Sequence, residues 1–331
     1  MSNEALIRLA VVGCGRMASE LVQRSVRMGR AKVVAIHDIA PEVMAERAAE
    51  FGAEIAPGLE ALARRADIDA FLVGSPPLHH RENVLALAPA GKPIYCEKPL
   101  CTTLAACDEM IAACHTHGAK LFVGQVLRLL PLFWKSHEVI ASGEIGTPQV
   151  ISITRAGRGT FFGTGWRSSF AETGGLLLEV NSHELDYMLF LMGEAETVYA
   201  QGLNLNGFGD YADALLVQIT FKNGGIGMLH SSNSSPLGEY RVHIQCSQGN
   251  MLHGGFGGEL KYRSFQAEQA TVIQASDLAD HPNGYDWELT SFFDWVRNDT
   301  PPLFTGETGR ANVAVAEAAY RSLVSGKPEP V

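Results

Sequence analysis

The chain has 331 residues, of which 46% are hydrophobic and 19% charged, and this composition excludes a disordered chain. Its formal net charge is −10, and no basic run offsets it, which argues against nucleic acid or an anionic membrane as a partner. The length favours two domains, because one hydrophobic core rarely keeps growing beyond about 250–300 residues.

The chain begins MSNEALIRLAVVGCG, which leads directly into a strand-like pattern. No basic segment precedes an apolar one, so we expect no signal peptide, and no apolar run is long enough to span a bilayer. The six cysteines form no CxxC pair, and Cys and His residues do not cluster at zinc spacing. We therefore expect reduced thiols, no bound metal and a cytoplasmic location.

Strand-like and helical patterns alternate through the first 124 residues. Apolar runs at 7–12, 32–36, 70–73, 93–96 and 120–123 predict strands. Helical patterns follow the first strand and recur at 41–51, 84–90 and 104–117. This alternation predicts βαβ units and a doubly wound parallel sheet. Because the strands are apolar throughout, helices should cover both faces of the sheet.

The pattern changes after Gly124. A strand is predicted at 147–157, and a long helix within 173–192 that begins after Gly174 and Gly175. Strand-like runs between 197 and 273 predict a large, mostly antiparallel sheet whose loose alternation suggests partial cover on both faces. Helices are expected at 287–297 and 310–324. We expect a second α/β domain over 125–331, whose last helix either stays there or packs back on the first domain.

The turn Gly13-Cys-Gly15-Arg16-Met17-Ala18 has the pattern GxGxxA, follows a strand and opens a helix. In such turns the first glycine permits the tight turn and the second lets the backbone approach a pyrophosphate. The small last residue lets the helix pack close to the strand. The helix N-terminus then presents free N–H groups to the phosphates. The alternative is a tight turn with no ligand.

Asp38 ends the second strand, close to the position of the acid in the dinucleotide fingerprint. A carboxylate there accepts hydrogen bonds from the adenosine ribose hydroxyls and repels the additional phosphate of NADP. We therefore predict that residues 1–124 form a Rossmann domain that binds NAD in preference to NADP. The alternative is a surface aspartate with no ligand.

Three further segments resemble the glucose–fructose oxidoreductase/inositol dehydrogenase/MocA family (Gfo/Idh/MocA). They are SPPLHH at 75–80, AGKPIYCEKPL at 90–100, and GWR at 165–167 followed by GGLLLEVNSHELD at 174–186. The resemblance implies a site between a Rossmann domain and a C-terminal domain whose large open sheet packs dimers or tetramers. It also implies oxidation or reduction of a hydroxyl or carbonyl on sugars, inositols and related compounds. Lys98 and His183 stand at the positions of the family's catalytic pair.

These two residues suit the chemistry of alcohol oxidation. A base must take the hydroxyl proton as the hydride departs, and a donor should steady the developing alkoxide. Lysine can do either if its environment lowers its pKa from about 10.4, and histidine titrates near neutrality. Lys98 also lies at a strand end, where open α/β sheets bind ligands.

Glu179, His183 and Asp186 have i, i+4 and i+7 spacing, which places them on one face of the expected helix. A carboxylate one turn from a histidine can fix its tautomer and raise its basicity. The alternative is a polar stripe on an amphipathic helix. Glu179 replaces the family's usual Asp, and Asn181 replaces a frequent Gly. Because glutamate is longer, Glu179 is expected either to orient His183 or to reach the substrate directly.

Other candidates carry weaker expectations. Ser75, Pro76, His80, Glu97 and Gln125 are expected at the dinucleotide, with a turn-stabilising role as the alternative for His80. Trp166 and Arg167 are expected at the substrate or the nicotinamide, and the alternative is an arginine that only ties a loop. Gln125 and Arg128 either contact the cofactor or hold the hinge. Residues 160–165 are expected to form a wall over the substrate, and His230, His243 and His253 to be structural.

Three functions remain open from the sequence. The first is an NAD-dependent dehydrogenase for a polyhydroxylated small molecule, in which Lys98 and His183 share proton transfer and Glu179 assists. The second is an enzyme that retains NAD and uses transient oxidation for elimination or glycoside cleavage. The third is a ligand sensor without turnover, which ranks last because such a protein needs neither Lys98 nor His183.

Overall fold

The computed structural model describes residues 5–159 and 164–331, which form two compact units. The first unit comprises the described residues up to Gln125 together with Tyr285–Arg310, and the second comprises Val126–Gly284 and Ala311–Val331. This division differs from the expected one in residues 285–310, which belong with the first unit. This C-terminal segment of the first unit contains most of helix α10 (Gly284–Asn298) and only the first turn of the last helix, α11 (Gly306–Ser325).

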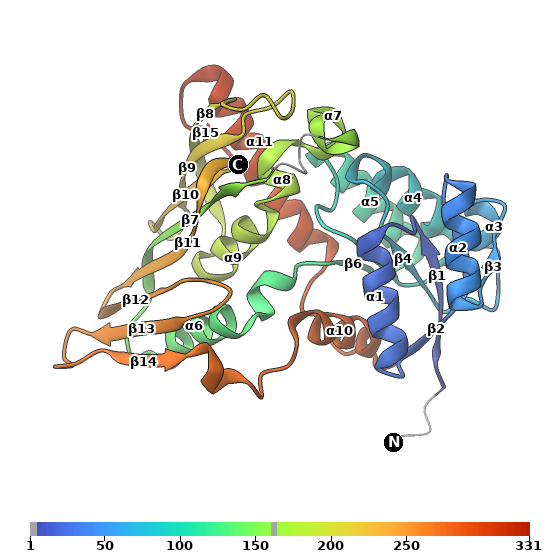
Figure 1. Ribbon diagram of the computed structural model, residues 1–331, viewed down its shortest axis with the longest axis horizontal. Helices are drawn as coiled ribbons and strands as arrows, with labels where there is room; N and C mark the ends of the chain where they lie inside the picture. The colour runs from blue at the N-terminus through green and yellow to red at the C-terminus, as the bar shows by residue number, and fades with distance from the viewer. Residues whose placement is uncertain (1–4, 160–163) are drawn as a thin grey trace. The chain divides into compact units, whose positions relative to one another are not determined.

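The first unit contains a parallel sheet with strand order β3-β2-β1-β4-β5-β6 (Figure 1). Its strands are β1 (Ile7–Val12), β2 (Ala31–His37), β3 (Glu54–Ile55), β4 (Ala70–Val73), β5 (Ile94–Cys96) and β6 (Leu121–Val123). From β1 the chain builds the sheet outward through β2 and β3 on one side. It then crosses back to the other side of β1, where β4, β5 and β6 follow, so the strand order reverses beside β1. In such sheets ligands bind outside the carboxyl ends of the strands at this reversal.

Helices cover both faces of this sheet, as expected from its apolar strands. They are α1 (Arg16–Arg27), α2 (Pro41–Phe51), α3 (Leu59–Ala63), α4 (His80–Leu87), α5 (Leu104–His117) and α10. Every residue of β4, β5 and β6 is buried. Helix α4 packs against α3 and α5, while α10 is joined to α1 by Arg24 and Asp286, whose Nη1 and Oδ1 atoms are 3.0 Å apart.

An aromatic cluster fixes α10 against β5 and β6. The ring of Tyr95 stacks on that of Phe122 with centroids 5.3 Å apart, and Phe292 from α10 meets both rings edge-on at 5.6 and 5.5 Å. Phe304 closes the cluster at 5.7 Å from Phe122. Such aromatic pairs add to the hydrophobic gain from burial, so this C-terminal segment belongs firmly to the first unit.

The second unit contains a sheet with strand order β14-β13-β12-β11-β7-β10-β9-β8-β15. Its strands are β7 (Pro148–Arg158), β8 (Ala195–Leu203), β9 (Ala214–Phe221), β10 (Ile226–Ser232), β11 (Ser234–Cys246), β12 (Gly249–His253), β13 (Glu259–Ser264), β14 (Thr271–Gln274) and β15 (Glu329–Pro330). Its strands pair antiparallel except for β7 with β10. The expected fold class, a Rossmann domain plus an α/β domain with a mostly antiparallel sheet, is confirmed.

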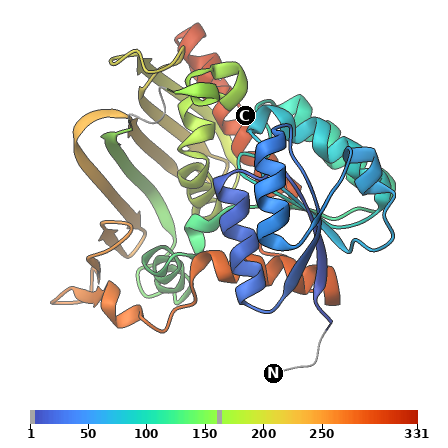
Figure 2. The ribbon, with the colours of Figure 1, turned by 45° about the vertical axis from the view of Figure 1, so that its right-hand side comes forward.

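The two faces of this sheet differ more than the sequence indicated. Ile153, Val217 and Leu229 are fully or almost fully buried on one face, along which helices lie in Figure 2. On the other face Leu216 and Met228 are 54% and 46% exposed. The second face is therefore the more exposed one, although it is partly covered, with Thr154 and Ser232 buried on it. The alternation looked loose because apolar residues also occupy exposed positions.

The helices of the second unit are α6 (Pro131–Ala141), α7 (Phe170–Thr173), α8 (Gly175–Glu179), α9 (Ser182–Met192) and most of α11. The long helix expected within 173–192 is wrong, because α8 ends at Glu179 and α9 begins at Ser182. Asn181, with φ −100° and ψ 5°, separates them, and its amide nitrogen donates to Glu184 Oε2 at 3.0 Å. A buried asparagine that bonds locally favours such a break.

Candidate functional site

The glycine turn is shaped by contact on one side and open space on the other. Gly13 has φ +77°, and a Cβ there would lie 2.3 Å from the backbone nitrogen of Ser75. A Cβ on Gly74 would lie 2.7 Å from that of Ala18, so small residues let α1 approach β4. Gly15 is exposed, and nothing lies within 4 Å of its hypothetical Cβ. The space beside Gly15 is where a pyrophosphate would approach.

Asp38 is tied to this turn. Its Oδ2 accepts from the backbone N–H of Cys14 at 2.7 Å, and its Oδ1 accepts from that of Ala40 at 2.9 Å. The carboxylate therefore holds the end of β2 against the turn. Burial, with the charge of Asp38, raises the pKa of the Cys14 thiol to about 12, so this cysteine stays protonated.

His80 links two segments that the sequence placed at the dinucleotide. Its Nδ1 lies 2.9 Å from the carbonyl oxygen of Pro99, and its Nε2 lies 2.8 Å from that of Ser75. Asn83 donates to Ser75 Oγ at 2.8 Å. The ring is fully buried, and burial lowers the pKa of His80. These contacts fit the structural alternative for His80, and Pro76 lies in the segment that they hold.

Lys98 follows β5 directly, at the carboxyl edge of the sheet. Glu97 donates its backbone N–H to Val73 at 2.9 Å, which extends the pairing of β4 with β5. The Oε2 atom of Glu97 accepts from the backbone N–H of Lys98 at 3.0 Å. Both residues are half-buried. The predicted reactive lysine therefore starts from a backbone that is fixed on its N-terminal side.

Gln125 provides a further test of whether this unit fits a dinucleotide. It follows β6, is fully buried, and neither its amide nitrogen nor its amide oxygen has a hydrogen-bond partner in the described part of the chain. Buried amides normally find partners. An unsatisfied amide at the carboxyl edge, with the space beside Gly15, fits a polar ligand such as the dinucleotide.

Three of the predicted substrate residues gather in the second unit. Arg167 donates from Nε to Glu179 Oε1 at 3.0 Å, and its guanidinium lies 4.0 Å from the ring centroid of Trp166. Tyr211 donates its hydroxyl to the carbonyl of Arg167 at 2.6 Å. Glu179 is only 7% exposed. One oxygen of Glu179 is thus engaged by arginine, so the residue is part of a buried ion pair.

The expected common face of Glu179, His183 and Asp186 is wrong, because Glu179 lies on α8 and the other two lie on α9. Asp186 instead binds Arg128, whose Nε donates to Oδ2 at 2.8 Å and whose guanidinium lies 4.6 Å from the ring centroid of Phe190. Burial raises the pKa of Asp186, and Arg128 opposes that shift. Arg128 therefore anchors the start of the second unit to α9.

Glu184 is a residue of this site that the sequence reasoning missed. It is fully buried beside half-buried His183 and accepts from Arg155 Nη1 at 2.9 Å, Tyr240 at 2.8 Å and Asn181 at 3.0 Å. It therefore fixes the first turn of α9, where His183 lies. The sequence signal was only an acid in the first turn of a helix, and two of its partners come from the distant strands β7 and β11.

The remaining histidines support the structural expectation. His253 accepts from Gly255 N–H at 3.1 Å, its ring centroid lies 5.0 Å from that of Phe133, and burial lowers the pKa of His253 to about 3. Burial also lowers the pKa of His243, and His230 lies on β10. The expected substrate wall at 160–165 falls largely on residues 160–163, which are outside the described residues.

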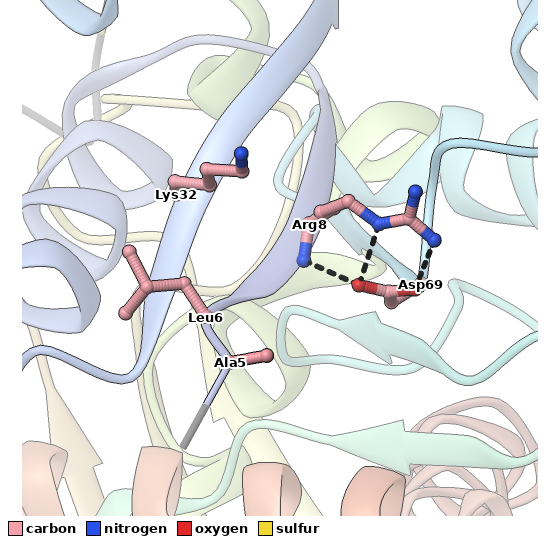
Figure 3. A pocket seen from close by; sticks show the side chains of 5 residues that line it. All are labelled: Ala5, Leu6, Arg8, Lys32 and Asp69. Atoms are coloured by element: carbon pink, nitrogen blue, oxygen red, sulfur yellow. Dashed lines mark hydrogen bonds and ion pairs between the residues drawn. The ribbon is translucent and has the colours of Figure 1, made fainter. Parts of the chain in front are cut away.

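A surface pocket lies elsewhere in the first unit (Figure 3). It is lined by Ala5, Leu6, Arg8, Lys32 and Asp69, at the amino ends of β1, β2 and β4. Arg8 is bound there to Asp69 through two contacts of 2.7 and 3.0 Å. This pocket is therefore at the opposite edge of the sheet from the glycine turn and does not include the predicted site.

All six cysteines are buried thiols that lie outside any disulfide. Over residues 5–159 and 164–331, no group of three His, Cys, Asp or Glu side chains is placed to hold a metal ion. Within the same ranges, no helix combines the length and apolar character needed to cross a membrane.

Comparison with known proteins decides the family. Residues 7–125 match the model of the Gfo/Idh/MocA oxidoreductase family with an NAD-binding Rossmann fold, and residues 133–252 match the family's C-terminal domain. The chain belongs to the Gfo/Idh/MocA family. Its first unit is accordingly the NAD-binding unit of an oxidoreductase.

Similar family members have different substrates. The myo-inositol 2-dehydrogenase of Thermotoga maritima is 28% identical, over 96% of each chain. The 2,7-anhydro-N-acetylneuraminate hydratase of Mediterraneibacter gnavus is 30% identical, over 95% of this chain and 93% of that protein. The structure of the WlbA dehydrogenase of Bordetella pertussis with NADH and UDP-GlcNAcA has a TM-score of 0.89 and 22% identity, over 99% and 98%. That last likeness supports the fold alone.

The open space beside Gly15 generates a prediction that separates folding from cofactor binding. A Gly15→Ala variant adds a methyl group that meets no protein atom within 4 Å, at φ −67°, which alanine adopts freely. The free energy of unfolding should stay within about 0.5 kcal/mol. The Kd for NADH should rise about 10-fold, or roughly 1.4 kcal/mol, because the methyl group occupies the approach of the pyrophosphate.

NADH fluorescence titration and urea denaturation measure these two quantities. Gly238→Ala is the matched control, since that glycine also has open space around it and lies on β11. An unchanged Kd in Gly15→Ala would place the dinucleotide elsewhere.

Proposed function

We propose that this protein is an NAD-dependent dehydrogenase that transfers a hydride between nicotinamide and a secondary hydroxyl or carbonyl of a sugar, cyclitol or related small molecule. The observation that carries the proposal is the placement of Lys98. It directly follows β5, at the carboxyl edge of an NAD-binding sheet, with its backbone held by Glu97. The myo-inositol 2-dehydrogenase among the relatives supports a polyhydroxylated substrate.

The dinucleotide would be held by residues at this edge of the first unit. NAD supplies the hydride acceptor when it is bound. Gly13 and Gly15 admit the pyrophosphate at the N-terminus of α1, with Arg16 and Met17 in its first turn. Asp38 faces the adenosine ribose. The remaining proposed contacts are Ser75, Pro76, Glu97, Lys98 and Gln125, while His80 supports the Ser75 segment through its buried ring.

The chain's own chemistry is proton transfer and orientation. Lys98 and His183 share removal of the hydroxyl proton and stabilisation of the developing alkoxide. Trp166, Arg167 and Glu179 orient the substrate, because they form one group in which buried Glu179 meets half-buried Arg167 and Trp166. Glu184 fixes the turn that carries His183 through its bonds to Arg155 and Tyr240.

A second function has one observation in its favour. A 30% identical relative is named a hydratase, and hydration produces no net reduced NAD. An enzyme that retains NAD and uses transient oxidation for elimination or glycoside cleavage would use the same Lys98 and His183. NAD that survives purification, with substrate conversion but no net NADH, would favour this function.

We also propose that the chain works in the cytoplasm as a homodimer or homotetramer, in which a second copy covers the open face of the large sheet. Leu216, Ile226, Met228 and Leu252 are all between 42% and 54% exposed on that face. They come from β9, β10 and β12, and exposed apolar residues that share a face mark interaction sites. A face that binds its own copy buries these residues in symmetric pairs.

The catalytic proposal predicts the effect of removing one amine. Lys98→Ala should lower kcat by about 10²–10⁴-fold, the usual contribution of a positioned acid or base. Lys32→Ala, which removes an exposed lysine at the amino end of β2, is the control. NADH formation is followed by absorbance with a panel of sugars and inositols. Full activity in Lys98→Ala would show that this lysine is not catalytic.

The cofactor preference predicts a change in selectivity. Asp38→Asn keeps an oxygen for one backbone N–H but removes the charge that opposes the 2′-phosphate of NADP. The ratio of kcat/KM for NADP to that for NAD should rise about 10-fold, or roughly 1.4 kcal/mol. Glu60→Gln, a loss of charge on exposed α3, controls for net charge. An equal ratio in both variants would mean that Asp38 does not select NAD.

The assembly proposal predicts that charge on the open face dissociates the oligomer. Leu216→Lys combined with Met228→Lys should shift the molar mass measured by light scattering to that of one chain, because buried like charges repel. Val324→Lys is the control, since Val324 is 91% exposed and lies on α11. If the double variant keeps the wild-type mass, this face is not the interface.

A further inference from the structure

The hydroxyl of Tyr95 lies between two carboxylates in the first unit. It donates to Glu288 Oε2 at 2.8 Å, and Glu97 Oε1 lies 3.5 Å from it. Tyr95 is fully buried on β5, and Glu288 is 1% exposed on α10, 193 positions later in the chain. A carboxylate buried to this degree loses its hydration, which costs several kcal/mol before its partners offset the loss.

These contacts lead directly to Lys98. Glu97 directs its other oxygen, Oε2, to the backbone N–H of Lys98 at 3.0 Å. A series of polar contacts therefore links Glu288 to the Tyr95 hydroxyl, the hydroxyl to the Glu97 carboxylate, and that carboxylate to the backbone of the proposed catalytic lysine. The single proton of the Tyr95 hydroxyl is shared between the two carboxylates, with a short contact to Glu288 and a long one to Glu97, so Glu288 governs how strongly the hydroxyl holds Glu97.

The surrounding packing keeps this chain of contacts rigid. The Tyr95 ring lies among Phe122 and Phe292, which fix the direction of its hydroxyl. A Cβ on Gly124 would lie 2.4 Å from the Tyr95 hydroxyl and 3.3 Å from Glu97 Oε1, so glycine makes room for both groups. Burial, together with Glu288 and Glu97, raises the pKa of Tyr95 well above its usual range, so the hydroxyl keeps its proton.

We infer that Glu288 is a positioning residue of the proposed dehydrogenase, which acts through the Tyr95 hydroxyl to orient Glu97 and through Glu97 to place Lys98. The inference rests on the proposed function, because that function makes Lys98 the reacting group. A misplacement of about 1 Å at a reacting group can cost 10²-fold in rate. A buried carboxylate on a distant helix is therefore an effective means of control over this lysine.

The decisive variant removes the whole polar pair. Tyr95→Phe combined with Glu288→Leu removes the donor and the acceptor of the buried hydrogen bond together, and replacing a buried polar pair by apolar residues is often neutral for stability. The free energy of unfolding in urea should therefore stay close to that of the wild type. The kcat should fall about 10-fold or more, while KM changes less than about 2-fold, because an interaction at the reacting group acts on the chemical step.

A single variant should have a smaller effect on kcat than the double variant. Glu288→Gln keeps an oxygen that accepts from Tyr95, so its kcat should lie between those of the wild type and the double variant. Tyr262→Phe is the matched control, because Tyr262 also donates to a glutamate, Glu144, at 3.1 Å in the second unit. It should retain wild-type kcat. A kcat that falls only in step with stability, or falls equally in the control, overturns the inference.

A measurement without turnover separates this inference from the proposed function. An amine-reactive acylating reagent labels lysines, and peptide mass spectrometry gives the rate at Lys98 relative to exposed Lys32. The double variant should change this ratio at least about 3-fold, and Tyr262→Phe should leave it unchanged. If no substrate is turned over but the ratio changes, the proposed function fails and the positioning of Lys98 stands. An unchanged ratio with an unchanged kcat overturns the positioning role.

Discussion

The close contact between the glycine turn and Ser75 is the constraint on which the NAD-binding unit depends. Gly13 has no room for a side chain because the Ser75 backbone occupies that space, and the Ser75 carbonyl oxygen in turn lies 2.8 Å from His80 Nε2. The other nitrogen of His80 reaches Pro99, next to Lys98. The carboxyl ends of β1, β4 and β5 are thereby joined at their loops. The glycine turn and the proposed catalytic lysine, which are far apart in sequence, thus share one support.

In the second unit, buried charged side chains join segments that are far apart in sequence. Glu184 accepts hydrogen bonds from Arg155, Tyr240 and Asn181, so that β7, β11 and the first turn of α9 meet at one carboxylate. Arg128 and Asp186 fix the same helix two residues later. A buried carboxylate is costly without partners, and each of these two has a cation and good hydrogen bonds. Both His183 and Lys98 therefore stand beside a glutamate that holds their own backbone segment.

The sequence predicted the local features well, because they depend on nearby residues. The Gly13–Ala18 turn, Asp38 at a strand end and Lys98 after β5 all follow from short patterns that determine backbone geometry. The sequence did not predict Tyr95 with Glu288, or Glu184 with Arg155, because those pairs form only when distant segments pack. The helix break at Asn181 was also missed, since helical spacing cannot reveal that Ser231 and Glu184 bind its side chain.

The break between α8 and α9 explains why a glutamate, Glu179, can stand where the family usually has an aspartate. Glu179 is the last residue of α8, and its longer side chain meets Arg167 in the turn Gly165–Ser168, before α7. The pair carries no net charge, and Trp166 lies against the guanidinium. A neutral group of donors and acceptors beside an aromatic face suits a neutral polyhydroxylated ligand better than an acidic one, because an anion would meet the Glu179 carboxylate as well as the arginine. The same residue that departs from the family pattern therefore supports the substrate class proposed for this protein.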